Sequence, residues 1–170
     1  MAHRFDHLQR VEFSDTDMAG IVHFSMFFRY MERAEHAFYR SLGFSVFEQE
    51  PDTAERRVGW PRAHASMDYR APLRFEERFR VELWVREVRR STIRHGFRFI
   101  GLKPAGDHDG DGAGDVDSLI DDGLRARGEL VVACVRKNAD GRMQAVELPD
   151  HVRRCLEPAP DDEWNQAFGP

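Results

Sequence analysis

A carboxylate, a glycine and the start of an apolar helix lie close together near the N-terminus, in the segment SDTDMAGIVHFS that runs from Ser14 to Ser25. Asp17 is in a turn beside apolar residues, and Gly20 permits a positive φ or a close approach of the chain to a ligand. The first N–H groups of the helix have no internal partner, and with the helix dipole they stabilise an oxyanion. These groups suit hydrolysis of an activated acyl group, with Asp17 attacking the carbonyl carbon or activating water.

The same turn also has a purely structural interpretation. Asx turns and N-cap aspartates are common between a strand and a helix. Asp15 and Asp17, two residues apart, can serve only to tie down the backbone. From the residues alone, both interpretations stay open.

The elements that must position this turn are a short strand and a long helix. Residues 4–13 have a strand-like pattern that ends in the turn formers. From Phe24 to Leu42, apolar residues recur at spacings of three and four, which predicts a helix of about five turns that ends before Gly43. Its expected core-facing residues are Phe24, Phe27, Phe28, Met31, Ala34, Phe38 and Leu42.

Period-two alternation after the helix predicts half-buried antiparallel strands. The runs lie at 63–70, 79–86, 93–99, 124–136 and 143–146, and 149–156 is a candidate for a short last helix. One long helix on the concave face of one antiparallel sheet is an α+β arrangement. Because one sheet hardly hides both sides of its helix, we expect self-association.

The chain has 170 residues, which predicts a single domain over 1–170 with a flexible, acidic, glycine-rich insertion at 104–123. The net charge of −5 gives no general basic field, so we expect no nucleic-acid partner. Cys134 and Cys155 are too few for a disulfide framework. No apolar run approaches the ~20 residues of a membrane span, and the polar start lacks a secretory signal. We therefore expect a cytoplasmic protein.

Other motifs point to no metal or cofactor. The run that begins at Asp107 resembles the start of a calcium loop, but Ser118 stands where a bidentate glutamate is needed. No H-E-x-x-H, G-x-G-x-x-G or G-x-S-x-G motif occurs in the sequence. Cys134 alternates with polar positions and is expected to be a small core residue. Arg89 and Arg90 either bind phosphates through forked donors or are solvated charges.

Two longer runs carry a family resemblance: VEFSDTDMAGIVHFSMFFRYMERAEHAFYRSLG and VGWPRAHASMDYRAPLRFEERFRVELWVREVRRST. They resemble hot-dog-fold acyl-CoA thioesterases of the 4-hydroxybenzoyl-CoA thioesterase-like family, and also the Tol-Pal-associated acyl-CoA thioesterases. The similarity extends over roughly residues 5–156 apart from the insertion.

The resemblance implies a hot-dog fold, in which a five- to six-stranded antiparallel sheet wraps one long helix. It implies that Asp17 is the catalytic carboxylate, that Asp15 is structural, and that the backbone N–H of Phe24 polarises the thioester carbonyl. The Tol-Pal-associated enzymes have a histidine at the position of Phe24. Either His23 substitutes for it here, or the site works with the aspartate alone, as the resemblance to the hydroxybenzoyl enzymes implies.

The resemblance further implies a coenzyme A contact by Arg89, Arg90 and Ser91. It implies active sites at the interface of a homodimer or homotetramer. The remaining candidate substrate-binding residues are Gly20, Val22, Ser25, Trp60 and Pro61.

The implied function is hydrolysis of an aromatic or short-chain acyl-CoA, with the coenzyme A thioester as substrate and no cofactor. The alternative is a hot-dog protein that binds acyl-CoA or an acyl carrier without hydrolysing it. A hot-dog hydratase is a third option, which usually relies on an aspartate–histidine pair in a different motif.

Overall fold

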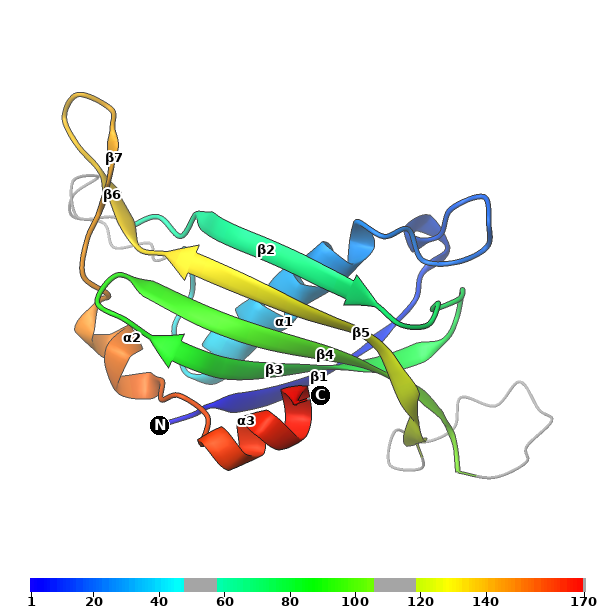
Figure 1. Cartoon of the computed structure of the whole chain (residues 1–170). Coiled ribbons are helices and arrows are strands. Elements are labelled where there is room, and N and C mark those ends of the chain that lie inside the picture. The colour runs from blue at the N-terminus through cyan, green and yellow to red at the C-terminus, as the bar shows by residue number, and fades with distance from the viewer. Residues whose placement is uncertain (48–57, 106–118, 170) are drawn as a thin grey trace.

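The computed structural model of this chain describes residues 1–47, 58–105 and 119–169. One long helix lies against one twisted sheet (Figure 1). In chain order the elements are β1 (Arg4–Arg10), the 3₁₀ helix η1 (Phe13–Asp15), α1 (Met26–Ser41), β2 (Arg62–Tyr69), β3 (Arg78–Val88), β4 (Thr92–Pro104), β5 (Leu119–Ala133), β6 (Val135–Lys137), β7 (Met143–Ala145), α2 (Asp150–Cys155) and α3 (Asp161–Phe168).

The main sheet has five strands in the order β1-β3-β4-β5-β2, so β1 and β2 are its edges. Every neighbouring pair is antiparallel. The predicted α+β fold with a helix wrapped by an antiparallel sheet is confirmed. β6 and β7 form a separate two-stranded ribbon, because the long predicted strand over 124–136 is interrupted at the buried Cys134.

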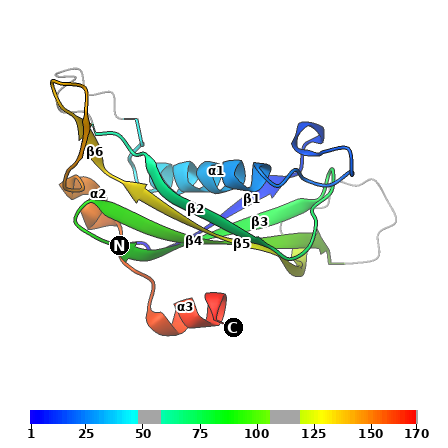
Figure 2. The same cartoon turned by 45° about the horizontal axis from the view of Figure 1, so that its top comes forward.

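The helix α1 lies in the concave face of the sheet (Figure 2). Its buried residues follow the predicted spacing of three and four, and the stripe also includes polar groups: Phe27, Tyr30, Met31, Ala34, Glu35, Phe38 and Tyr39. The prediction that the helix starts at Phe24 was wrong. Phe24 lies in the turn before α1, with 61% of its surface exposed. Gly43 has φ +86°, as expected for a residue that ends a helix.

The convex face of the sheet is partly covered by α3, which the sequence patterns did not reveal. In Figure 2 α1 and α3 lie on opposite sides of the sheet. Trp164 stacks on Phe168 at 4.1 Å between ring centroids, and both pack beside the buried Trp84. A Cβ at Gly96 would come within 2.4 Å of the Trp164 ring, so only glycine admits the indole at this position.

Three C-terminal predictions can be compared with the structure. The short helix expected at 149–156 is α2, and the strand expected at 143–146 is β7. The acidic insertion is shorter than the predicted 104–123, because Pro104 pairs with Leu119 and residues 119–123 belong to β5. The rest of the insertion, residues 106–118, and the calcium-like run within it lie outside the described residues.

Candidate functional site

A tight turn carries the candidate carboxylate between η1 and α1. The Asp17 N–H donates to the Ile21 carbonyl at 2.9 Å, and the Gly20 N–H donates to the Asp17 carbonyl at 3.0 Å. Gly20 has φ +72°, which L side chains rarely adopt, and a Cβ there would meet no other atom within 4 Å. The glycine is therefore required by backbone conformation and not by crowding.

Asp15 is a structural residue. Its side chain is buried, and Oδ2 accepts hydrogen bonds from the Glu12 N–H at 3.1 Å and from the Tyr30 hydroxyl at 2.8 Å. Its carbonyl accepts the His23 N–H at 2.9 Å. Asp15 thus ties the start of the loop both to the end of the loop and to the first turns of α1.

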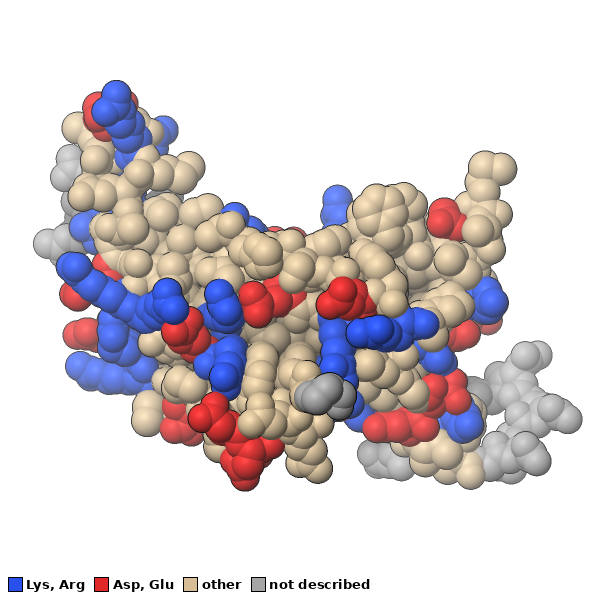
Figure 3. All heavy atoms as spheres, viewed as in Figure 1, with Lys and Arg blue, Asp and Glu red and all other residues tan. Residues whose placement is uncertain are grey.

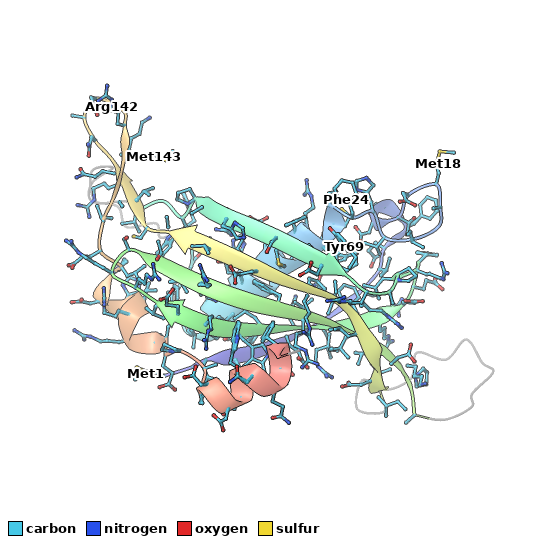
Figure 4. All side chains as sticks on the ribbon, viewed as in Figure 1. Met1, Met18, Phe24, Tyr69, Arg142 and Met143 are labelled. Atoms are coloured by element: carbon cyan, nitrogen blue, oxygen red, sulfur yellow. The ribbon has the colours of Figure 1, made fainter. Side chains whose placement is uncertain are left out.

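Asp17 has a different environment, because its side chain is exposed. Oδ1 accepts the Ala19 N–H at 2.8 Å, which is an Asx-turn bond, and in the described part of the chain no partner is found for Oδ2. The next residue, Met18, projects fully into solvent at the tip of the loop (Figure 4). The carboxylate therefore keeps one oxygen free while the other fixes its direction.

The turn before α1 supplies the candidate oxyanion donor. The Phe24 N–H makes no hydrogen bond within the described residues, and Ser25, at the N-cap, makes no side-chain capping bond. The His23 imidazole lies against the Phe24 ring, with Nδ1 2.8 Å from the Ser25 hydroxyl. Val22 is buried. The loop thus gathers Asp17, Gly20 and residues 22–25 at one end of the molecule.

Tyr69 belongs to this end, although the sequence patterns did not single it out. It is the last residue of β2, and its hydroxyl donates to the Phe24 carbonyl at 3.0 Å. Figure 4 shows the two labelled side chains close together at the ends of β2 and α1. Alternation in the sequence predicts that Tyr69 lies in a strand, but no local pattern pairs it with Phe24.

Trp60 and Pro61 lie at the other end of β2, so a single chain does not bring them to Asp17. Trp60 is half-buried, Pro61 is exposed, and the Trp60 carbonyl accepts Nη1 of Arg62 at 2.8 Å. At about 3.3 Å per residue, the β2 segment from Arg62 to Tyr69 extends over roughly 23 Å.

Arg89, Arg90 and Ser91 form the turn between β3 and β4, at the same end as Trp60. Both arginines are exposed, and they pair with Glu87 and Glu147, each at 2.8 Å. Basic side chains gather at this end of the molecule (Figure 3). A groove of about 560 Å³ lies beside the turn, lined by Arg86, Glu87, Arg89, Arg94 and residues 158–161. This groove is remote from Asp17 in one chain.

A buried group of ionisable side chains lies between α1 and the sheet, and the sequence patterns did not reveal it. Glu35 accepts a hydrogen bond from Arg62 and another, at 3.3 Å, from the Tyr39 hydroxyl. The Tyr39 oxygen is 2.9 Å from Nε2 of His95. Burial raises the pKa of Glu35 to about 7, against the attraction of Arg62. Burial also lowers the pKa of His95 to about 3.

Two further observations concern ligands and membranes. Among the described residues no group of three or more His, Cys, Asp or Glu side chains is placed to hold a metal ion. Cys134 is buried, and burial raises the pKa of its thiol to about 11, which makes it a poor nucleophile. No helix in the described ranges has the length and apolarity needed to cross a membrane.

Comparison with known proteins shows that the chain belongs to a known family. Residues 11–156 match the family model described as "Thioesterase-like superfamily". The 4-hydroxybenzoyl-CoA thioesterase of Pseudomonas sp. (strain CBS-3) is 26% identical over 157 residues, which cover 91% of this chain and 99% of that protein. The acyl-CoA thioesterase YbgC of Haemophilus influenzae is 29% identical over 84 residues, which cover 49% of this chain and 60% of that protein.

A solved structure shows the same fold. It is the crystal structure of an aspartate-to-asparagine variant of 4-hydroxybenzoyl-CoA thioesterase in complex with 4-hydroxybenzoyl-CoA. It superposes with a TM-score of 0.70 at 20% identity and covers 91% of this chain and all of that one. The predicted hot-dog fold is confirmed.

Proposed function

Because the chain belongs to the thioesterase-like superfamily, we propose that it is an acyl-CoA thioesterase, which converts an acyl-CoA and water into a carboxylic acid and free coenzyme A. The observation that carries the proposal is the pairing, on one loop, of the exposed Asp17 carboxylate with the unpaired Phe24 N–H. The names of the relatives support the same chemistry.

Asp17 acts on the thioester carbon in one of two ways. As a general base it takes a proton from water, whose oxygen then adds to the carbonyl carbon. As a nucleophile its free Oδ2 adds directly and forms an anhydride, which water hydrolyses. In both cases the C–S bond breaks, and the coenzyme A thiolate takes up a proton.

The oxyanion that forms on the carbonyl oxygen is held by the Phe24 N–H and the N-terminal end of α1. Since the Phe24 N–H has no partner in the described chain, it can donate to the oxyanion without first breaking another hydrogen bond. Gly20, Val22 and Ser25 shape the walls of this site. His23, whose ring contacts that of Phe24, is proposed to assist near the reacting carbonyl.

The complete site is proposed to need two chains. β2 is an edge strand, and the surface along it carries few charged side chains in the view of Figure 3. Antiparallel pairing of β2 with a second β2 puts the Tyr69 end of one copy beside the Trp60 end of its partner. Trp60, Pro61 and the β3–β4 turn of one copy then complete the Asp17 site of the other. A homodimer is the minimal unit, and a homotetramer repeats it.

The β3–β4 turn is proposed to bind the phosphates of coenzyme A. Arg89 and Arg90 are exposed and carry guanidinium groups that suit phosphate oxygens, and Ser91 adds a hydroxyl. The adjoining groove adds Arg86, which pairs with Asp161 at 2.9 Å, and Arg94, which pairs with Glu129 at 3.7 Å. The acyl group is proposed to be aromatic or short.

The test is thiol release from benzoyl-CoA, 4-hydroxybenzoyl-CoA and short acyl-CoAs by the wild-type protein and by Asp17→Asn. We expect the variant to fold normally and to lose about 100-fold or more in kcat, because a carboxamide neither takes the proton nor attacks. Asp162→Asn, which changes an exposed carboxylate on α3, is the matched control and should keep full activity. Saturable acyl-CoA binding without thiol release would instead identify a non-catalytic binding protein.

A further inference from the structure

We propose that Tyr69 is a positioning residue for thioester hydrolysis, whose hydroxyl fixes the turn that presents the Phe24 N–H to the substrate. This inference rests on the proposed function. It concerns a side chain on the sheet that lies outside the catalytic loop in sequence and that acts through the backbone of Phe24.

Tyr69 is placed to hold the turn, because one side of its ring packs on the core although 46% of the residue is exposed. The ring contacts Phe27 edge-on at 5.2 Å between centroids, and Phe27 in turn contacts Phe99 of β4 at 5.1 Å. Phe27 is only 3% exposed. The hydroxyl at the end of this chain of rings donates to the Phe24 carbonyl at 3.0 Å. The position of the Phe24 carbonyl is therefore set by β2, which carries Tyr69, and by α1, which follows Phe24.

Few other contacts hold residues 24 and 25 in the turn before α1. The Phe24 side chain is 61% exposed, so packing within one chain does not hold it. The Ser25 side chain makes no capping bond. The peptide that carries the Phe24 N–H is held through the His23 carbonyl, which accepts the Met26 N–H at 2.9 Å. On the following peptide the Ser25 N–H makes only a long bond of 3.4 Å to Nδ1 of His23. The Tyr69 hydroxyl supplies the shorter bond, to the Phe24 carbonyl.

The two restraints lie on either side of the proposed oxyanion donor. The Phe24 N–H and the Phe24 carbonyl belong to neighbouring peptide planes, which are related only by φ and ψ of Phe24. Fixing the carbonyl limits ψ, and fixing the previous plane limits the N–H direction. A donor that is directed in advance stabilises the oxyanion without paying for reorganisation during the reaction.

The hydroxyl can fill this role throughout the range of ordinary assays. Burial raises the pKa of Tyr69 above the usual value of 10.0, so the group stays protonated and continues to donate.

The test compares Tyr69→Phe with the wild type, since this change removes the hydroxyl and keeps the ring against Phe27. We expect kcat for benzoyl-CoA to fall about 3- to 10-fold, the size of effect expected for one lost hydrogen bond. The dissociation constant of S-benzyl-CoA, which lacks the carbonyl, should change less than about 2-fold. The unfolding midpoint should also stay nearly constant.

An NMR measurement separates this inference from the proposed function. In Tyr69→Phe the backbone amides of Phe24 and Ser25 should lose order, while that of Asp15 keeps its wild-type value. Unchanged order at Phe24 would overturn the inference, as would a parallel loss of kcat, S-benzyl-CoA affinity and thermal stability. Absence of thiol release by the wild type would overturn the proposed function, and the catalytic role of Tyr69 with it.

Discussion

The buried carboxyl of Glu35 should make the folded protein less stable as the pH rises from acid to neutral. Its side chain is fully buried, and it faces Arg62 at the start of β2, Glu32 and Tyr39 on its own helix, and His95 on β4. Loss of water around the carboxylate outweighs the attraction of Arg62, so the folded state favours the protonated acid. The informative perturbation is Glu35→Gln, which imitates that neutral form.

The size and sign of the effect follow from the pKa of Glu35. In the unfolded chain this group ionises near pH 4.5, and in the folded protein near pH 7. Between these values the folded state binds more protons, so its stability falls as the pH rises. At about 1.4 kcal/mol per pH unit, the window corresponds to a loss of roughly 3 kcal/mol, which is complete above the folded pKa.

The assay is urea unfolding of the wild type and of Glu35→Gln between pH 5 and pH 8, at one protein concentration. Relative to the wild type, the variant should gain about 2 to 3 kcal/mol between these limits, because the assay starts just above the unfolded pKa. The titration of His95, whose lowered pKa removes stability in acid, is present in both proteins and cancels in the difference. Glu32→Gln is the matched control, because Glu32 also faces Arg62 but is 54% exposed.

Two results would refute this reasoning. A stability difference that stays constant with pH would mean that Glu35 ionises alike in the folded and unfolded states. A wild type that gains on the variant as the pH rises would mean that the ion pair with Arg62 is stronger than the desolvation of the carboxylate.

Two other perturbations test separate parts of the structure. Trp164→Ala removes the stack on Phe168 and uncovers Trp84, and should lower the free energy of unfolding by about 2 kcal/mol, less than the ~3–5 kcal/mol of a fully buried indole. Urea unfolding measures it, and an unchanged midpoint would show that α3 adds nothing to the sheet. Replacing Arg89 and Arg90 with Gln should raise KM for acyl-CoA about 10-fold and leave KM for the matching acyl-pantetheine thioester unchanged, because the latter lacks the nucleotide phosphates. Equal effects on both substrates in steady-state kinetics would exclude a phosphate contact.

The fold was largely predictable from the sequence, because its main determinants are periodic. The spacing of Phe27, Met31, Ala34 and Phe38 predicts the buried face of α1, and period-two alternation predicts the strands around it. The helix start was misplaced, since Phe24 continues the apolar spacing although it lies in a turn. The spacing of apolar residues predicts which side of a helix is buried, but it does not predict at which residue the helix begins.

The candidate site was predictable only in its local part. The turn around Asp17 and Gly20 is contiguous in sequence, and the resemblance to a family is the basis of its proposed role. The bond from Tyr69 to the Phe24 carbonyl joins residues 45 positions apart, and the contact of Glu35 with Arg62 joins residues 27 positions apart. Such pairs depend on the register between the sheet and the helix, which a single sequence does not reveal.

The packing of α3 on the convex face of the sheet has a consequence for synthesis of the chain. The ribosome finishes every strand of the sheet before it adds residues 161–168, so Trp84 and the space over Gly96 are left unshielded while the rest of the molecule folds. During that interval the nascent chain presents the indole of Trp84 to chaperones and to neighbouring chains. A product that ends before Trp164 keeps this indole uncovered, so factors that bind exposed apolar surface can recognise it.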